Sequence, residues 1–596
     1  MTELEFPPGL ILIAGAIALI TLSKWQRLWK FASVLFPLLT LVGIWTFPED
    51  GSVEVAFLDF TLIVAKFNLP TKAFATVFAL MTMTGAVYAL NQDRRIELPA
   101  AFLYAGSAIG VTFAGDLFTL FVFWELMAVG STIVIWAAQT EGSRRAGMRY
   151  ANVHLLGGVI FMLGIALHAL ETGSLALPEL ALTGGIMDPV TPSPFALLDS
   201  PQAVLMLLGI LINTGAPGLG AWLPDAYPEA SESGTVFLSA FTTKTSVYVL
   251  MVLYAGTPLL IYVGAAMAIY GIVYAILEND IRRILSYSIV NQVGFMICAV
   301  GLGTGLSLNG ATAHAFAHII YKALLLMSAG SVLYMTGKRK CTDVGGLYRT
   351  MPVTMWCGII GALAISAVPL TSGFTTKSMI TEAAAHNHEM LAWFVLVAAS
   401  AGVFLHAGIK FPWFVFFQRD SGLRPEDPPS NMRWAMIFFA VLCVALGVYP
   451  EPLYTILPFY SDHQAAHPGE PLYQAFTPAH VVSQLQLLLF AGLAFFVLLP
   501  MLKRTLTITL DSDWLYRALI PSLWTHMVRP ALQLLAPLHR GLIDGIPRFA
   551  RREFGSTEDG MKTGSTRPAQ PEWGVGRSVL VLTAILMLFL AINFIA

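Results

Sequence analysis

The chain has 596 residues, of which 56% are hydrophobic and only 12% are charged, and its formal net charge is −2. A soluble domain carries about 25% charged residues, so this composition excludes an ordinary water-soluble enzyme and predicts an integral membrane protein. The balanced charge offers no basic surface of the kind that phosphate binding requires, so no nucleic-acid partner is expected.

The four cysteines stand far apart in the sequence and form no CxxC motif. Their spacing therefore suggests neither a disulfide framework nor an iron–sulfur site, and we expect no cofactor. These residues are Cys298, Cys341, Cys357 and Cys443.

A bilayer core of about 30 Å needs roughly 20 apolar residues per helical span. The sequence contains about sixteen such runs, which predicts an all-α polytopic membrane protein. Acidic Glu3 and Glu5 stand where a signal peptide would be basic, so we expect the first run to remain as a helix. The predicted spans are 8–23, 31–47, 72–91, 99–114, 117–138, 149–170, 202–221, 233–254, 257–277, 285–303, 310–336, 352–384, 391–416, 433–449, 481–502 and 576–595.

Lysine and arginine gather in the loops that follow odd-numbered spans, for example Arg94 and Arg95 after the third and Arg282 and Arg283 after the ninth. Because cytoplasmic loops are rich in these residues, the pattern predicts a multi-pass protein of the bacterial cytoplasmic membrane with both termini outside. One odd-numbered loop is acidic instead, WLPDAYPEASESG at 222–234. The acidic loop is either chance or a functional segment, and the motifs described below favour the second interpretation.

The stretch 503–573 differs from the rest of the chain. Its first part mixes Leu, Ile and Trp with spaced Arg and His, which is typical of an amphipathic helix lying on the membrane surface or on a partner. Its last part is a polar Gly/Ser/Thr/Pro linker before the final span.

Several ionisable residues lie inside predicted spans, where they are costly and usually mark an ion route. Asp116 and Glu125 lie near the start of the fifth span, and Lys244 lies in the middle of the eighth. Glu125 could also be a purely structural partner for a lysine, and a lysine near a helix end could reach the interface instead. The others are His314, His318, Lys322, Lys377, His406 and Lys410.

His314, His318 and Lys322 recur at intervals of four residues and therefore share one helix face. Two histidines at this spacing can bind zinc, but no glutamate follows the first of them as in HExxH. The pattern favours a proton relay over a metal site, and we predict no metal.

Two spans contain glycine and proline interruptions: NTGAPGLGAW at 213–222 in the seventh, and Pro369 to Gly373 in the twelfth. Interruptions at corresponding places in two halves are typical of inverted repeats in transporters, although a packing kink is the alternative. The predicted organisation is N-terminal helices 1–98, a first five-helix repeat 99–255, a second repeat 256–417, two helices in 418–502, the lateral segment and linker 503–573, and a last helix 574–596.

Three motifs in order, WLPDAYPEA (222–230), DIRRILSYSIVNQVGF (280–295) and HAFAHIIYKALLL (314–326), strongly resemble the antiporter-like subunit family. This family includes the large subunits of Mrp-type Na⁺/H⁺ antiporters and the proton-pumping membrane-arm subunits of respiratory complex I. The resemblance covers roughly 70–450 and is greatest to the D-type subunits of Mrp antiporters. It implies a subunit of a multisubunit membrane complex in the lipid bilayer that moves protons, with Na⁺ or K⁺ as the exchanged ion.

The resemblance also implies roles for single residues. Glu125 matches the glutamate of the fifth helix, Lys244 the lysine of the eighth, and Lys377 the ionisable residue of the broken twelfth. His314 and His318 fall where the family has the polar residues of the hydrated central axis, and Lys322 matches the lysine that often follows them. Asp116, His406 and Lys410 are further relay candidates because they are ionisable residues in or beside spans, and not because of the resemblance. The motif residues carried over are Trp222, Pro224, Asp225 and Glu229.

Asn213 departs from the family pattern, because a lysine is expected nine residues before Trp222. An amide can order water but cannot carry a proton. Three alternatives remain: conduction through water at Asn213, another base such as His154 or Lys244, or an inactive first half-channel. The C-terminal extension is a second departure, and it suggests a docking role for 513–552.

The sequence is compatible with three functions. The first is antiport, with Asp116, Glu125, Thr242, Thr243 and the backbone at the helix interruptions as oxygen ligands for the cation. The second is a proton-conducting subunit of a redox-driven, hydrogenase-linked or inorganic-carbon uptake complex, in which partners supply any redox chemistry. The third is a scaffold without transport.

Overall fold

The computed structural model describes residues 6–57, 60–183, 185–500, 511, 514 and 518–530. The chain divides into two compact units, Met1–Leu515 and Tyr516–Ala596. In the second unit the described helices are α21 (Ile520–Leu523) and the π-helix η8 (Trp524–Val528). The predicted last span lies outside the described residues, as does most of the predicted docking segment 513–552.

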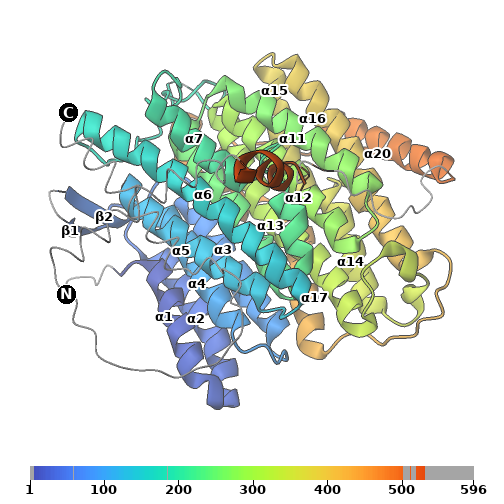
Figure 1. Cartoon of the computed structure of the whole chain (residues 1–596). Coiled ribbons are helices and arrows are strands. Elements are labelled where there is room, and N and C mark those ends of the chain that lie inside the picture. Colours follow the sequence, from blue (N-terminus) through green and yellow to red (C-terminus); the bar gives the residue numbers. More distant parts are fainter. Residues whose placement is uncertain are drawn as a thin grey trace, which may run out of the picture. The chain divides into compact units, whose positions relative to one another are not determined.

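The first unit is built from helices (Figure 1). Its α-helices are α1 (Pro8–Thr21), α2 (Gln26–Thr46), α3 (Thr71–Ala89), α4 (Glu97–Phe113), α5 (Leu117–Trp136), α6 (Glu141–Thr172), α7 (Pro201–Thr214), α8 (Trp222–Ala226), α9 (Gly234–Leu238), α10 (Thr242–Tyr254), α11 (Pro258–Leu277), α12 (Ile281–Leu302), α13 (Gly305–Thr336), α14 (Pro352–Ile365), α15 (Ser372–His386), α16 (Met390–Val403), α17 (Ser430–Val448), α18 (Glu451–Tyr454), α19 (Tyr460–Ala466) and α20 (Pro478–Leu498). Two π-helices, η5 (Phe404–Lys410) and η6 (Trp413–Phe417), continue α16.

Within the described residues, eleven helices are long and apolar enough to cross a membrane, so the chain is an all-α multi-pass membrane protein in its main architecture. Every predicted span that falls on described residues overlaps a helix. The number of such helices is below the sixteen predicted spans for two reasons. Helices α1, α4, α7 and α14 are apolar but too short to be included, and one predicted span is not described.

A small hairpin was not predicted from the sequence. Strands β1 (Ser52–Phe57) and β2 (Phe60–Lys66) pair antiparallel, and β2 lies against α4 and α5 (Figure 1). The hairpin occupies a stretch that the hydropathy pattern left as a loop between the second and third spans, so the chain is not strictly all-α.

Three membrane spans are divided into two helical segments. The seventh ends in α7 at Thr214, and Gly215 follows with a φ of 80°, which a glycine tolerates without strain. The twelfth is interrupted between Ile365 and Ser372, and the eighth is interrupted between Leu238 and Thr242. The first two interruptions were predicted from glycine and proline, and the third was not.

Glycines allow helices of the first unit to approach closely. A Cβ atom at Gly264 of α11 would lie 2.5 Å from the Gly294 carbonyl of α12, and one at Gly209 of α7 would lie 2.8 Å from the Gly157 carbonyl of α6. Such backbone contacts are a common way to pack helices where lipid removes the hydrophobic driving force.

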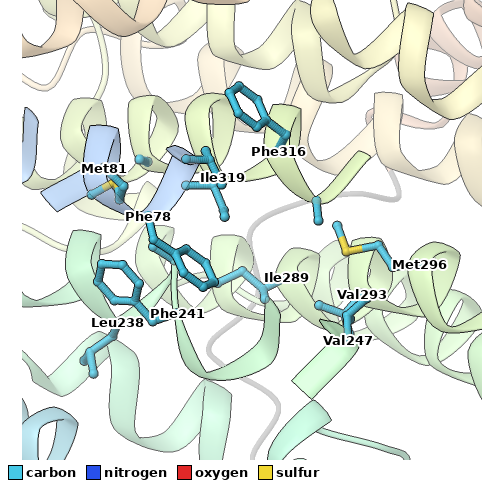
Figure 2. Close-up of a cluster of buried hydrophobic side chains, with 14 of the residues drawn as sticks. Phe78, Met81, Leu238, Phe241, Val247, Ile289, Val293, Met296, Phe316 and Ile319 are labelled. Atoms are coloured by element: carbon cyan, nitrogen blue, oxygen red, sulfur yellow. The ribbon is translucent and has the colours of Figure 1, made fainter. Parts of the chain in front are cut away.

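Part of the interior of the first unit is an apolar cluster to which α3, α9, α10, α12 and α13 contribute side chains (Figure 2). Phe78 of α3, Phe241 just before α10, Ile289 of α12 and Ile319 of α13 are among its side chains. The most apolar stretch of α12 is fully buried, and that of α13 is almost fully buried. Polar groups on these two helices therefore have protein, and not lipid, around them.

Candidate functional site

Lys244 is fully buried on α10, one turn from the interruption that separates α9 from α10. Its Nζ donates to the carbonyl oxygen of Ser239 at 2.6 Å and to Thr243 Oγ1 at 3.2 Å. The last carbonyls of a helix have no partner within the helix. The interruption after α9 therefore supplies the acceptor for this buried ammonium group.

Lys377 on α15 has an equivalent arrangement at the interruption of the twelfth span. Its Nζ donates at 3.0 Å to the carbonyl oxygen of Ile365, the last residue of α14. The ammonium group also lies 5.0 Å from the ring centroid of Phe295 on α12, within the range of a cation–π interaction.

Lys322 on α13 is fully buried and faces α12. Its Nζ donates to Ser288 Oγ at 2.8 Å, with the Leu285 carbonyl more distant at 3.4 Å. Both acceptors are neutral.

His314 joins α13 to α12 and α15. Its Nε2 lies 3.1 Å from Gln292 Oε1, and its Nδ1 lies 3.2 Å from Thr376 Oγ1. Tyr321 donates to the same Gln292 oxygen at 3.1 Å. His318, one turn further along α13, is fully buried, and neither of its ring nitrogens has a hydrogen-bond partner among the described residues.

These three lysines and two histidines, called the row below, lie on α10, α13 and α15 inside the first unit. His318 interacts electrostatically with Lys244, Lys322, His314 and Lys377, and Lys322 interacts with both other lysines. Among the described residues, none of the three lysines forms an ion pair with a carboxylate. The structure therefore brings together five of the residues predicted from the sequence.

His406 and Lys410 on η5 extend the row. His406 Nδ1 lies 2.8 Å from the Gly402 carbonyl, and the imidazole interacts with Lys322, Lys410 and Lys377. Lys410 Nζ donates to three carbonyl oxygens at the end of α11, those of Ala275, Ile276 and Glu278, at 2.5 to 3.1 Å.

Glu125 on α5 lies apart from that row. Its carboxylate fits against Gly158 of α6, where a Cβ atom would clash with Oε1. Oε1 is buried and has no hydrogen-bond partner among the described residues. Among the residues that the structure describes, Glu125 therefore forms no ion pair with a lysine.

Asn213 lies in the last turn of α7, beside His154 of α6. The amide oxygen Oδ1 of Asn213 is buried and makes no hydrogen bond to a described residue. The same holds for both ring nitrogens of His154.

Asp116 is the N-cap of α5. It accepts hydrogen bonds from the amide and hydroxyl groups of Thr119 and from the amide of Ile63 on β2, each at 2.7 Å. Glu125 is nine residues further along α5, which places it about 13 Å away along the helix axis. The two carboxylates therefore cannot bind one cation together.

The hydroxyls of Thr242 and Thr243, the other predicted cation ligands, already have partners. Thr242 Oγ1 lies 2.6 Å from the hydroxyl of Tyr104 and 3.3 Å from that of Tyr150. Thr243 Oγ1 accepts from Lys244.

The motif at 222–230 anchors the broken seventh span. The Trp222 indole donates to the carbonyl of Ile212 at 2.9 Å, near the end of α7. Asp225 forms a two-pronged ion pair with Arg149 of α6, at 2.7 and 3.0 Å. Pro224 is buried within α8.

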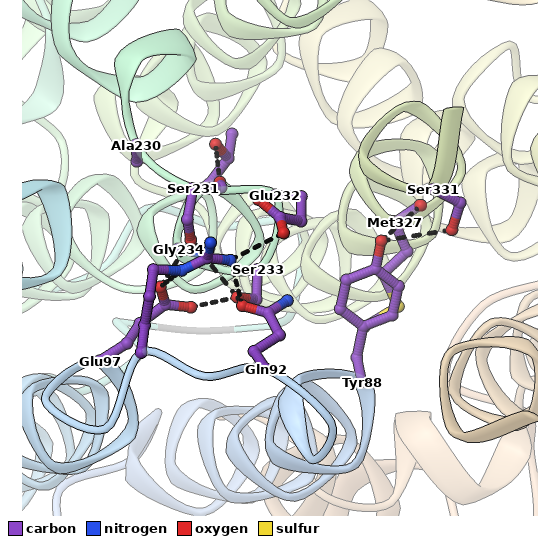
Figure 3. A network of polar contacts seen from close by, with 12 residues as sticks. Tyr88, Gln92, Glu97, Ala230, Ser231, Glu232, Ser233, Gly234, Met327 and Ser331 are labelled. Carbon is purple, nitrogen blue, oxygen red and sulfur yellow. Dashed lines mark hydrogen bonds and ion pairs between the residues drawn. The ribbon is translucent and has the colours of Figure 1, made fainter. Parts of the chain in front are cut away.

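Arginines from other loops neutralise the remaining acids of this loop. Glu229 pairs with Arg339 at 3.0 Å, and Glu232 pairs with Arg94 at 2.8 Å. Arg94 also binds the buried carboxylate of Glu97, which accepts from Ser231 and Ser233 (Figure 3). The exception to the loop-charge pattern is thus an acidic segment balanced by basic neighbours.

Sequence reasoning missed the neutral members of the row: Ser288, Gln292, Tyr321 and Thr376. Ser288 and Gln292 are four residues apart on α12, in a stretch that also contains the polar residues Ser286 and Asn291. Polar side chains on one face of an apolar helix were therefore a usable signal for them. Thr376 became relevant only through folding, because it is 62 residues from its partner His314.

A cavity of about 390 Å³ reaches Lys377 from the protein surface. Ser378, Thr381 and Glu382 of α15 line it together with Gln484 and His480 of α20. His480 Nε2 lies 3.1 Å from Glu382 Oε2 across this cavity.

Residues 114–404 match the family described as NADH:quinone oxidoreductase/Mrp antiporter, transmembrane. The N-type subunit of NADH-quinone oxidoreductase from Desulforudis audaxviator is 33% identical over 59% of this chain and 74% of its own length. The D-type subunit of the Na⁺/H⁺ antiporter from Alkalihalophilus pseudofirmus is 27% identical over 69% of this chain and 83% of its own. The A/B-type subunit of a probable K⁺/H⁺ antiporter from Rhizobium meliloti is 29% identical over 75% of this chain, but the match spans only 45% of that relative.

Two solved assemblies contain chains with the same fold. A chain of the Mrp complex from Dietzia sp. superposes with a TM-score of 0.66 and 19% identity, over 78% of this chain and 98% of that one. A chain of the membrane-bound sulfane sulfur reductase, an archaeal respiratory membrane complex, gives a TM-score of 0.68 and 21% identity over 98% of this chain and 99% of that one.

Proposed function

The chain belongs to the family of NADH:quinone oxidoreductase and Mrp antiporter transmembrane proteins, and from this premise we propose that it is the proton-translocating subunit of a multisubunit Mrp-type cation/proton antiporter. Protons pass through Glu125, Lys244, His318, His314, Lys322 and Lys377, and Na⁺ or K⁺ moves in the opposite direction. Its similarity to the D-type subunit of a Na⁺/H⁺ antiporter supports this assignment. So does its similarity to a chain of an Mrp complex, at the level of the fold.

One observation carries the proposal: three lysines and two histidines are buried in a row and paired only with neutral acceptors. Like charges repel strongly in a low-dielectric interior. A proton that arrives at one amine therefore favours release of the proton from the next. A row of this kind can pass charge without moving whole helices.

Two inverted five-helix repeats, 99–255 and 256–417, form the proposed framework of this path. Helices α6 and α13, one from each repeat, have 32 residues each and begin with Thr–Ser capping boxes, Thr140–Ser143 and Thr304–Ser307. Helices α5 and α12 are likewise capped by Asp116 and Asp280. These correspondences support the repeat, and the interrupted seventh and twelfth spans lie in corresponding places.

In this proposal the arginine-rich loops face the cytoplasm of a bacterial cell, and the cavity beside Lys377 opens on the opposite side. The turn after α15 belongs to that outer side in the predicted topology. Lys377 therefore exchanges protons with the outside through the cavity lined by α15 and α20.

Replacing Lys244 by alanine tests the proposal. We expect Lys244→Ala to reduce proton transport in inverted vesicles containing the complete complex by at least about a hundredfold, because a methyl group cannot accept a proton. Transport is followed with a pH-sensitive dye after addition of Na⁺ or K⁺, and assembly is followed by co-purification of the other subunits.

Lys66→Ala is the matched control, since Lys66 is exposed and pairs with exposed Glu179. It should transport at the wild-type rate. Wild-type transport by Lys244→Ala in an assembled complex would refute the proposed path.

A second candidate function is a proton-conducting subunit of a redox-driven complex. The similarity to an NADH-quinone oxidoreductase subunit and the nearly complete superposition on the sulfane sulfur reductase chain favour it. Purification of the native complex separates the two functions. Flavin or iron bound by co-purifying subunits supports the redox-driven complex, whereas their absence together with Na⁺- or K⁺-dependent proton transport supports the antiporter.

A further inference from the structure

His154 of α6 occupies a position equivalent to that of His318 of α13. Each imidazole is fourteen residues beyond the threonine of its helix's capping box, Thr140 or Thr304. Each is almost completely buried, and each has two ring nitrogens without a hydrogen-bond partner among the described residues. His318 belongs to the row of lysines and histidines, whereas His154 lies in the other half of the chain.

Two aromatic side chains pack against the imidazole of His154. Its ring centroid lies 4.0 Å from that of Tyr150 and 4.5 Å from that of Trp222. Trp222 is held by its hydrogen bond to the Ile212 carbonyl. The imidazole therefore packs against two aromatic rings, and neither ring nitrogen makes a hydrogen bond of standard geometry to a described residue.

Polar atoms without partners gather around this imidazole. The Asn213 amide of α7 lies beside it, and its Oδ1 is buried and unbonded among the described residues. Gly158 is one helical turn beyond His154 on the same face, and the buried Glu125 Oε1 fits against it. Buried polar atoms are usually bonded to protein or to ordered water. Several unbonded atoms in one place therefore indicate a hydrated site.

Hydroxyl groups lie between Tyr150, which packs against His154, and the start of α10, the helix that carries Lys244. The Tyr150 hydroxyl donates to Ser131 Oγ at 3.0 Å and lies 3.3 Å from Thr242 Oγ1. Thr242 begins α10, two residues before Lys244.

We infer that His154 is the proton carrier that connects Glu125 to Lys244, through water held by Asn213 and the hydroxyls of Tyr150 and Thr242. This inference rests on the proposed function. An imidazole can accept a proton on one nitrogen and release it from the other, whereas the neighbouring amide of Asn213 cannot. The first half of the chain then conducts protons without a lysine at position 213.

The test compares variants of the full chain in the assembled complex. Glutamine keeps hydrogen bonding but cannot be protonated, so we expect His154→Gln to lower proton transport at least tenfold. His154→Lys restores a titratable group and should recover at least a third of the wild-type rate. His168→Gln is the matched control, because His168 lies on the same helix, is partly exposed, and contacts Phe195 and Thr172; it should transport normally.

A second substitution distinguishes a proton-carrying role of His154 from a structural one. Asn213→Lys introduces a titratable amine next to the imidazole, so in the His154→Gln background it should restore transport at least fivefold. A purely structural histidine would not be replaced by an amine on another helix. Failure of both His154→Lys and Asn213→Lys to restore transport overturns the inference, as does full activity of His154→Gln.

These results can be distinguished from failure of the proposed function. If Lys244→Ala is inactive and His154→Gln is fully active, proton translocation stands and only the role of His154 falls. If Lys244→Ala is fully active, the relay itself is refuted.

Discussion

Each of Lys244, Lys377 and Lys410 directs its buried ammonium group at backbone carbonyls at the end of a helical segment. The last carbonyls of a helix lack intrahelical partners and carry the negative end of its dipole, so they stabilise a cation. Lys410 differs from the other two in having three such acceptors. This geometry indicates a structural role for Lys410, in which its side chain caps the C-terminal end of α11 (called the clasp below).

The variants Lys410→Arg and Lys410→Met distinguish a structural role of Lys410 at the end of α11 from a role in proton transfer. Arginine keeps the donors but does not release a proton, so we expect Lys410→Arg to keep transport within about twofold of wild type. Methionine leaves the three carbonyls without donors and should destabilise the protein by about 2–4 kcal/mol, seen as a lower midpoint of thermal unfolding of the detergent-purified complex. If Lys410→Arg is as inactive as Lys244→Ala, protons pass through Lys410 and the clasp interpretation is wrong.

At the scale of helices, the sequence correctly predicted the features that depend on local amino-acid composition. Hydropathy located the spans, and glycine and proline located the interruptions after Thr214 and Ile365. The break before Thr242 was not predictable in this way, because neither glycine nor proline stands between Leu238 and that residue. The backbone there is instead held by tertiary contacts, including the hydrogen bond from the Thr242 amide to the Tyr104 hydroxyl.

Of the candidate site, only the ionisable residues could be predicted from the sequence. Charges stand out in an apolar span, and helical spacing placed His314, His318 and Lys322 on one face. Their actual partners depend on which helices pack together. His314 was not predicted to bind Gln292 and Thr376, because these residues come from two other helices.

The cavity between α15 and α20 gives a further prediction at this scale. Cysteine reacts as the solvated thiolate, so a cysteine in a water-filled cavity should react with a membrane-impermeant maleimide. Thr381 lines the cavity, and we expect Thr381→Cys to be labelled at least tenfold faster than Ser328→Cys, whose position on α13 is fully buried. The four native cysteines are buried, so background labelling should be low. Equal labelling of the two variants would mean that water does not reach Lys377 by this route.

At the scale of the whole first unit, the acidic segment 222–234 ties distant loops together. Asp225 binds Arg149 of α6, Glu232 binds Arg94 before α4, and Glu229 binds Arg339 after α13. Arg339 also pairs with Asp280, the N-cap of α12. One arginine thus connects the segment after the broken seventh span to two helices that contribute to the buried row.

Arg339→Ala should weaken this connection measurably. It leaves the buried Asp280 carboxylate and Glu229 without their shared partner, and Arg339 is itself one-third exposed, so we expect a loss of about 1–3 kcal/mol. Arg349→Ala is the matched control, because the Arg349–Asp420 pair is largely exposed and should contribute below about 1 kcal/mol. Thermal unfolding of the purified complex at low and high salt measures both. Since salt screens exposed pairs far more than buried ones, the effect of Arg339→Ala should persist at high salt. If the two variants lowered the midpoint of thermal unfolding equally, and high salt removed both effects, the ion pairs of Arg339 would be ordinary surface pairs. They would then not hold the two halves of the first unit together.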